Sequence, residues 1–294
     1  MRVDGVFSGG GIRGIAFVGA IAVLEERGFL FERVAGTSAG SIIAAMLASG
    51  YSSEEMYREI NQLTLTDILD KRKWTIPFPL LRWLPLFWRM GLYSGQKLED
   101  WIENLLWKKG VKTFADVKAG ALKIIASDLS NGKILVFPDD LHRYNLAPES
   151  FPIAKAVRMS CTVPYFFEPV ILKHQKKKSV IVDGGVLSNF PMWVFDHGKG
   201  KNKRPIIGIR LSPKLDEIPP NEINHALDLF EALIKTMKDA HDNRYISKRH
   251  AKNIIFIPTD GISSLDFSGD ANQVEALIRI GREEAERFLK RWTY

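Results

Sequence analysis

Cysteine is almost absent from this sequence of 294 residues, and histidine is scarce. The single cysteine, Cys161, excludes an internal disulfide and fits a reducing compartment. A thiolate metal site needs at least a second cysteine, and the six histidines form neither an H-E-x-x-H motif nor a close pair. We therefore expect neither a structural nor a catalytic metal.

The sequence also lacks a long hydrophobic run. Its most apolar stretch, residues 14–24, is too short to span a bilayer. A glycine cluster precedes this stretch, Glu25-Glu26-Arg27 follows it, and no A-x-A cleavage site is present, so a signal peptide is not expected. The stretch predicts a buried helix in a cytoplasmic protein.

Acidic residues are outnumbered, with 34 Asp and Glu against 41 Lys and Arg. The net charge of +7 favours an anionic partner such as nucleic acid, an anionic membrane or an acidic substrate. No recognition-helix or stacking-aromatic motif accompanies the basic residues, so we expect no nucleic acid. A hydrophobic content of 46% and a charged content of 26% are those of an ordinary globular protein.

One segment, residues 71–93, is basic and aromatic and contains no acidic residue. Its three prolines exclude a long regular helix. Tryptophans mixed with lysine and arginine predict either an interfacial anchor on an anionic membrane or a flap whose rings are simply buried. The side chains expected to reach membrane or substrate are Trp74, Phe78, Trp83, Phe87 and Trp88.

Strand, glycine turn and helix follow one another twice near the start of the chain. Residues 3–8 predict a strand, Gly9–Gly14 a turn, and the next residues a helix that ends near Gly28. A second short strand ends before Gly36, and a helix follows over residues 41–49. Two such units favour an α/β fold with a mainly parallel sheet and crossover helices.

The rest of the chain continues with both kinds of element. Further strands are predicted at 122–126, 133–137, 169–172, 180–182, 206–211 and 254–257, and further helices at 52–60, 97–109, 153–159, 224–248 and 273–291. Ser52 and Glu55 form a capping-box pattern for the first of these helices. No linker or repeat divides the sequence, so we expect one domain, residues 1–294, with residues 71–93 inserted as a flap.

Ser38 lies at the centre of a G-x-S-x-G pentapeptide, Gly36–Gly40, between a predicted buried strand and a predicted buried helix. This is the context of a nucleophile elbow, where a serine sits on a sharp turn that requires small neighbours. The N-terminus of the following helix favours an oxyanion near that serine. Alone, the pentapeptide also fits a glycine turn with an N-capping serine.

The Gly9–Gly14 loop allows two interpretations. As G-x-G-x-x-G between a strand and a helix, it matches a dinucleotide-binding fingerprint. That site needs an acidic residue closing the second strand, whereas Glu32 precedes the strand and Ser38 follows it. We favour an oxyanion loop, in which bare glycine amides approach a tetrahedral oxygen and Arg13 adds positive charge, and we expect no cofactor.

A carboxylate, Asp183, ends the predicted buried strand 180–182 and precedes Gly184 and Gly185. Ligands of parallel sheets gather at the carboxyl ends of the strands, so Asp183 is a candidate partner for Ser38. An aspartate before two glycines is also common as a structural turn residue.

Four motifs together resemble those of the patatin-like phospholipase family. In chain order they are Gly9-Gly10-Gly11-Ile12-Arg13-Gly14, Gly36-Thr37-Ser38-Ala39-Gly40, Ser160-Cys161-Thr162-Val163-Pro164 and Asp183-Gly184-Gly185. The resemblance implies a three-layer α/β/α sandwich with a mainly parallel central sheet and a Ser–Asp dyad without histidine. It implies hydrolysis of acyl esters of lipids such as phospholipids. The net charge and residues 71–93 lead us to expect a cytoplasmic protein with peripheral contact to the inner face of an anionic membrane.

The resemblance also assigns roles to residues. Ser38 is the expected nucleophile and Asp183 the general base, which activates first Ser38 and then a water that releases the acyl group. The expected oxyanion hole comprises Gly9, Gly10, Gly11 and Arg13. The expected elbow and turn glycines are Gly14, Gly36, Gly40, Gly184 and Gly185.

Two alternatives remain open at this point. A Ser-His-Asp esterase of the α/β-hydrolase type has the chain order serine, acid, histidine, which Ser38, Asp183 and His197 would fit. Against it, the elbow follows only the second strand, and His197 lies in a polar loop. The other alternative is a non-catalytic membrane-surface binding protein, which explains the charge and residues 71–93 but neither the elbow nor the glycine loop.

Overall fold

The protein is described here by a computed structural model covering residues 1–63, 68–70, 88–174, 177–196, 204–212, 223, 229, 232, 233, 236, 251–259 and 271–293. The flap residues Trp74, Phe78, Trp83 and Phe87 lie outside this part of the chain, as do His197 and most of the helix predicted at 224–248.

The two predicted strand–turn–helix units are both present. In the first, β1 (Arg2–Phe7) leads through the short 3-10 helix η1 (Gly11–Ile15) into α1 (Ala16–Glu26). In the second, β2 (Leu30–Thr37) leads into α2 (Ala39–Ala48). The strands are buried on both faces at their carboxyl ends, because helices and loops cover both sides of a parallel sheet.

Among the described residues, these strands belong to one eight-stranded sheet with the order β10-β9-β1-β2-β4-β8-β7, in which β5 pairs with β4. The added strands are β4 (Leu122–Asp128), β5 (Lys133–Phe137), β7 (Val170–His174), β8 (Lys177–Asp183), β9 (Ile206–Arg210) and β10 (Ile254–Phe256). Neighbours from β10 to β4 are parallel, whereas β5 and β8 run antiparallel to β4, and β7 runs antiparallel to β8. The predicted α/β class with a mainly parallel sheet is confirmed.

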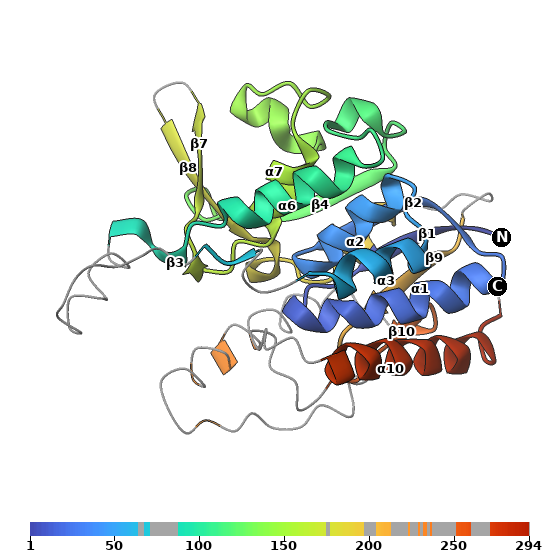
Figure 1. Ribbon diagram of the computed structural model, residues 1–294. Helices are drawn as coiled ribbons and strands as arrows, with labels where there is room; N and C mark the ends of the chain where they lie inside the picture. The colour runs from blue at the N-terminus through green and yellow to red at the C-terminus, as the bar shows by residue number, and fades with distance from the viewer. Residues whose placement is uncertain are drawn as a thin grey trace.

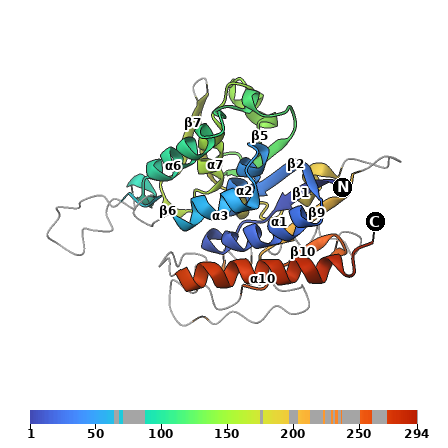
Figure 2. The same cartoon turned by 45° about the vertical axis from the view of Figure 1, so that its right-hand side comes forward.

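Helices cover one face of the sheet over a large core. They include α1, α2, α6 (Gln96–Trp107), α7 (Ile153–Ser160) and α10 (Ala271–Leu289), as Figures 1 and 2 show. Against the opposite face, the 3-10 helix η6 (Met192–Phe195) packs on Val6, Ala35 and Ile125. The sheet therefore lies between two layers, with the larger core on the α1 side.

The first and last long helices lie side by side, and both chain ends are on the same side of the molecule (Figure 1). Their backbones touch at two glycines. A Cβ on Gly19 would lie 2.0 Å from the carbonyl oxygen of Ile278, and one on Gly281 would lie 2.0 Å from that of Ala16. Residues near the C-terminus thus complete the layer that residues 16–26 begin.

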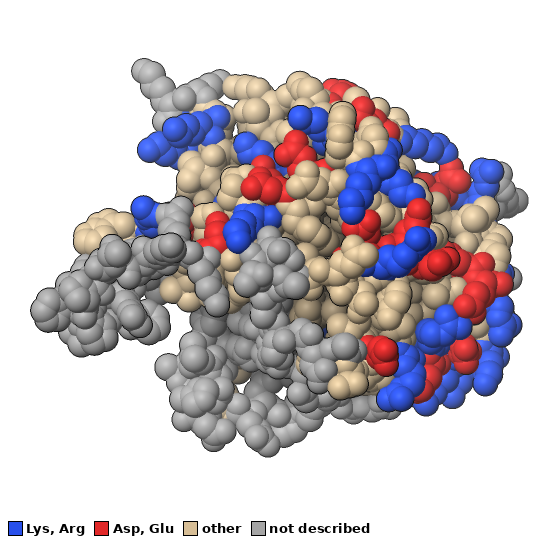
Figure 3. Space-filling view, viewed as in Figure 1, with Lys and Arg blue, Asp and Glu red and all other residues tan. Residues whose placement is uncertain are grey.

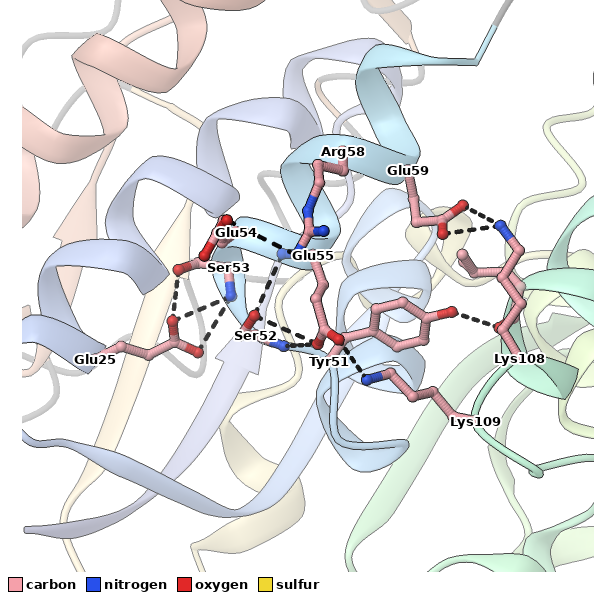
Figure 4. Close-up of polar contacts among 11 residues, drawn as sticks. Glu25, Tyr51, Ser52, Ser53, Glu54, Glu55, Arg58, Glu59, Lys108 and Lys109 are labelled. Atoms are coloured by element: carbon pink, nitrogen blue, oxygen red, sulfur yellow. Dashed lines mark hydrogen bonds and ion pairs between the residues drawn. The ribbon is translucent and has the colours of Figure 1, made fainter.

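The helix α3 (Ser53–Asn61) is anchored by polar contacts (Figure 4). The predicted capping box is confirmed, because the Glu55 amide donates to Ser52 Oγ and the Ser52 amide donates to the Glu55 carboxylate. Glu55 and Glu59 also bind Lys109 and Lys108 of the α6 end, each at 2.7 Å. Acidic and basic side chains are intermixed over this face of the molecule (Figure 3).

A small second sheet was not predicted from the sequence. It consists of β3 (Gly91–Tyr93) and β6 (Tyr165–Phe167), which pair in parallel. Several apolar side chains on and beside it are exposed, namely Trp88 (69%), Met90 (42%), Leu92 (48%) and Tyr165 (57%). The described end of the predicted flap therefore carries an exposed apolar surface.

Candidate active site

Ser38 lies on the turn between β2 and α2, with φ 52° and ψ −126°. A side chain at positive φ strains the backbone by about 1–3 kcal/mol and needs support from its surroundings. The flanking glycines permit the turn: a Cβ on Gly36 would lie 2.1 Å from the Gly40 carbonyl oxygen, and one on Gly40 would lie 2.4 Å from that of Phe7. The chain therefore has the strained strand-to-helix serine of an elbow.

Hydrogen bonds hold both peptide groups of Ser38. Its amide donates to Ser160 Oγ at 2.8 Å. Its carbonyl oxygen accepts from the Ser41 amide at 2.8 Å and from Ser41 Oγ at 2.6 Å. Thr37 Oγ1 adds a bond of 3.0 Å to the carbonyl oxygen of Ser188. Ser38 itself is 6% exposed.

The strand β4 brings the chain of Asp183 next to that of Ser38. One edge of β4 pairs with β5 from Ile124 to Asp128, so β2 and β8 must share the other edge. On that edge Thr37 pairs with Ile125 and Asp183 pairs with the next residue, Ala126. Successive residues of a strand are about 3.3 Å apart, so the ends of β2 and β8 meet.

The direction of β8 differs from the prediction. The sequence predicts Asp183 at the carboxyl end of a strand that runs parallel to its neighbours. Instead β8 runs antiparallel to β4, while β2 runs parallel to it. The carboxyl ends of β2 and β8 approach each other from opposite directions, head to head on one edge of β4.

The Asp183 side chain is buried, at 2% exposure, and Oδ1 accepts the Gly185 amide at 2.6 Å. Its own amide donates to the carbonyl oxygen of Thr162 at 2.8 Å. Gly184 packs so closely on β4 and β2 that a Cβ would lie 2.2 Å from the Ile125 carbonyl oxygen and 3.0 Å from Thr37 Cγ2. Gly184 therefore lies against the elbow strand.

Cys161 lies next to Ser41, on the helix that follows Ser38. Its buried sulfur lies 3.8 Å from Ser41 Oγ. Burial raises the pKa of the Cys161 thiol, and the negative charge of Asp183 adds to this effect, while hydrogen bonds with Ser41 and Ser38 act in the opposite direction. The thiol is therefore influenced by both members of the predicted dyad.

The glycine-rich loop also lies against Ser38. A Cβ on Gly9 would lie 3.2 Å from Ser38 Cβ and 2.4 Å from Asn189 Oδ1. The Gly9 amide donates to the Asn189 carbonyl oxygen at 3.0 Å, and Arg13 Nε donates to the carbonyl oxygen of Gly10 at 3.2 Å. Of the expected oxyanion residues, Gly9 thus uses its amide to bind Asn189, and Arg13 binds the loop backbone. Gly14 packs on the elbow helix, since its Cβ would lie 2.8 Å from Ala39 Cβ.

The structure also has a surface hollow away from Ser38 and Asp183. A surface hollow of about 470 Å³ between α1, α3 and α10 is lined by none of the predicted site residues. Within the described ranges, no group of three or more His, Cys, Asp or Glu side chains is placed to hold a metal ion. In the same part of the chain, no helix has the length and apolar character needed to cross a bilayer.

Three groups near Ser38 and Asp183 were given no role from the sequence, namely the Ser160 hydroxyl, the Cys161 thiol and the Thr162 carbonyl. The S-x-x-x-P pattern at Ser160 and Pro164 was the available signal, because it marked this segment without indicating a role. Nothing local in the sequence indicated Asn189.

The sequence is similar to those of known proteins. The family model described as "Patatin-like phospholipase" matches residues 5–196. The chain is 52% identical over 294 residues to "Uncharacterized protein YqhO" of Bacillus subtilis (strain 168), with 100% of both chains covered. It is 27% identical over 206 residues to "Probable lipid hydrolase 463L" of Invertebrate iridescent virus 6, covering 68% of this chain and 65% of that protein.

A solved structure shares the fold. The crystal structure of VipD from Legionella pneumophila matches with a TM-score of 0.58 at 17% sequence identity. The match covers 99% of this chain and 67% of that chain.

Proposed function

The chain belongs to the patatin-like phospholipase family, and from this premise we propose that it is a serine lipid acyl hydrolase that cleaves carboxylic ester bonds of phospholipids. Ser38 is the proposed nucleophile and Asp183 the general base. The observation that carries the proposal is the meeting of β2 and β8 on one edge of β4, which supports a Ser38–Asp183 dyad. The likeness to a protein described as a lipid hydrolase supports the substrate class.

The proposed reaction has two steps. In the first, Asp183 takes the hydroxyl proton while Ser38 Oγ bonds to the ester carbonyl carbon, and the tetrahedral intermediate then expels the lysolipid alkoxide, which receives that proton. In the second, Asp183 takes a proton from water, the water oxygen attacks the acyl-enzyme, and Ser38 leaves as the alkoxide and is reprotonated. The fatty acid is released and the enzyme regenerated.

The proposed oxyanion donors are the amides of Gly10 and Gly11 in the loop packed on Ser38. Gly11 has a φ of +59°, and such a backbone presents amides where an ordinary side chain would be strained. One preorganised donor of this kind contributes about 3–4 kcal/mol to stabilising the transition state. The Gly9 amide and Arg13 serve to hold the loop through Asn189 and Gly10.

The test is mass spectrometry of products from mixed phospholipid vesicles. We expect the wild type to release fatty acid and lysolipid, and Ser38→Ala and Asp183→Asn to release neither above background while remaining folded. A fluorophosphonate probe, which phosphonylates an activated serine with loss of fluoride, should label the wild type but not Ser38→Ala. Unlabelled, folded wild-type protein would favour the non-catalytic binding protein.

A second variant separates the dyad from the Ser-His-Asp alternative. His197→Ala should retain wild-type turnover if Asp183 alone serves as base. A loss comparable to that of Asp183→Asn would instead favour the triad.

We further propose that the enzyme meets its substrate at an anionic membrane surface. The exposed side chains of Trp88, Leu92 and Tyr165 and the net charge of +7 support this contact. Trp88→Ala with Tyr165→Ala should weaken co-sedimentation with vesicles containing anionic lipid. Trp107→Ala is the matched control, because Trp107 is 65% exposed at the end of α6. Equal binding by both variants would reject the surface without affecting the catalytic assignment.

A further inference from the structure

The C-terminal end of α7 contacts both members of the proposed dyad. Ser160, the last residue of α7, accepts the Ser38 amide at 2.8 Å. Two residues later, the Thr162 carbonyl oxygen accepts the Asp183 amide at 2.8 Å. Between them, the Cys161 sulfur lies 3.8 Å from Ser41 Oγ, and the charge of Asp183 contributes to raising the pKa of this thiol. A segment of three residues therefore connects two chain regions that are 145 residues apart in sequence (183 − 38).

Within this segment, the Ser160 hydroxyl makes the contact that a substitution can remove. Ser160 is fully buried, and its hydroxyl donates to the Ile125 carbonyl oxygen at 2.5 Å while it accepts the Ser38 amide. A hydroxyl can donate and accept at once, and alanine can do neither. Ile125 pairs with Thr37 in the sheet, so Ser160 connects the elbow to the central strand beside it.

The Ser38 backbone needs support on both sides. Its carbonyl is held by Ser41, on the helix that follows the elbow. Its amide is held by Ser160, on a different element. A residue in such a strained backbone conformation persists only when its surroundings restrict it. Removing Ser160 Oγ leaves the Ser38 amide without this hydrogen bond.

We propose that Ser160 is a positioning residue for the nucleophile. Its hydroxyl holds the Ser38 amide and thereby keeps Ser38 in the strained conformation from which Oγ reacts, without touching the substrate. The inference rests on the proposed role of Ser38. It also assigns the Ser38 amide to Ser160, so oxyanion donors come from elsewhere in the site.

The experiment measures the reaction rate for each active molecule. Fluorophosphonate labelling gives an amplitude, which counts competent sites, and a rate constant, which reports the reactivity of Ser38. Because small displacements of a reacting group cost about 10²-fold in rate, Ser160→Ala should label to the wild-type amplitude about 10²-fold more slowly. For a short-chain ester, kcat should fall by a similar factor with KM unchanged within threefold.

The matched control is Ser179→Ala. It removes a hydroxyl of the same residue type that is 1% exposed on β8 and belongs to a different hydrogen-bond network. It should retain the wild-type rate. Ser160→Thr keeps the hydroxyl and should retain at least one third of the rate. A rate for Ser160→Ala within threefold of the wild type, or equal losses in Ser160→Thr and Ser160→Ala, would overturn the inference.

A readout independent of activity separates this inference from the proposed function. Hydrogen exchange of the Ser38 amide, measured by NMR, should be at least tenfold faster in Ser160→Ala while the β8 amides keep their wild-type exchange. Unchanged Ser38 exchange would overturn the inference even for an active enzyme. A wild type that neither labels nor hydrolyses esters would count against the proposed function, and amide exchange would still decide the role of Ser160. If Ser160→Ala does not fold, Ser160→Cys, whose thiol is a weaker acceptor, should show the same changes.

Discussion

Asp128 and Asp183 are two buried aspartates on neighbouring strands with different surroundings. Asp183 pairs with Ala126 across the β4–β8 ladder, and Asp128 pairs with Ile181. Because side chains alternate along a strand, these four residues face the same side of the sheet. Asp128 is 0% exposed and Asp183 is 2% exposed, so burial does not distinguish them.

Asp128 is held by several side-chain donors. Asp128 accepts the Asn131 amide at 3.1 Å, Asn131 Nδ2 at 2.6 Å and the Tyr144 hydroxyl at 2.7 Å. Ser179 and His174 extend this network into the β7–β8 hairpin. Burial opposes the ionisation of Asp128, but the hydrogen bonds from Asn131, Tyr144 and Ser179 outweigh it and lower its pKa.

Asp183 lies in a different environment. Its carboxylate accepts the backbone amide of Gly185, and its charge contributes to raising the pKa of the Cys161 thiol. The strand that carries it ends next to β2, which leads into Ser38. A carboxylate surrounded by side-chain donors is stabilised in its charged form and serves the fold. We infer that one near a strained serine serves chemistry. Three predictions test this comparison, and a fourth tests the anchoring of α3.

The largest expected effect separates the two aspartates by activity. Asp183→Asn should lower ester hydrolysis per folded molecule by about 10²–10⁴-fold, because a general base contributes that much. Asp128→Asn should retain the wild-type rate per folded molecule, measured by labelling amplitude and initial rate together. Similar losses in both variants would remove the functional distinction.

The next largest effect is on stability, where Asp128→Asn should lose more than Asp183→Asn. Asp128→Asn places an amide donor against the donors of Asn131 and Tyr144, so the free energy of unfolding should fall by about 3 kcal/mol. Denaturant unfolding at pH 7 measures it. Asp183→Asn is the comparison variant, and a loss as large as that of Asp128→Asn would indicate that Asp183 has an equal structural role.

The acid sensitivity of the fold should follow Asp128. The pKa of Asp128 is lowered in the folded state. Its contribution to the free energy of unfolding is therefore present above the unfolded pKa of about 3.9 and is lost as the pH falls through the lower folded pKa. The difference in unfolding free energy between wild type and Asp128→Asn should therefore shrink as the pH falls below about 4. A difference that stays constant from pH 7 to pH 2 would contradict the assigned direction.

The smallest effect concerns the polar anchors of α3 at the surface (Figure 4). Ser52→Ala removes the N-cap of α3 and should lower the unfolding free energy by about 1 kcal/mol, with activity unchanged. The control is Glu54→Gln, which removes an ion pair of 3.7 Å with Arg58 between exposed side chains and should cost less than about 0.5 kcal/mol. If Ser52→Ala costs no more than Glu54→Gln, the capping box does not stabilise the protein.

Prediction from sequence succeeded where the physical cause is local. Gly36 and Gly40 flank the elbow because no side chain fits there, and Ser52 with Glu55 caps α3 as their spacing predicted. The α/β class followed from two strand–glycine–helix units. The pairing of β3 with β6 was missed, because each strand has only three residues and neither shows a periodic pattern.

The sequence by itself determined a strained serine between a strand and a helix, a glycine loop before it and an aspartate before two glycines, because these features depend on residues adjacent in the chain. The tertiary structure alone decided how they meet. It turned β8 antiparallel to β4, so that Asp183 and Thr37 occupy consecutive positions on one edge, and it placed Ser160 and Thr162 between them. Strand direction and register are set by packing between distant segments, and the pattern within any one segment does not determine them.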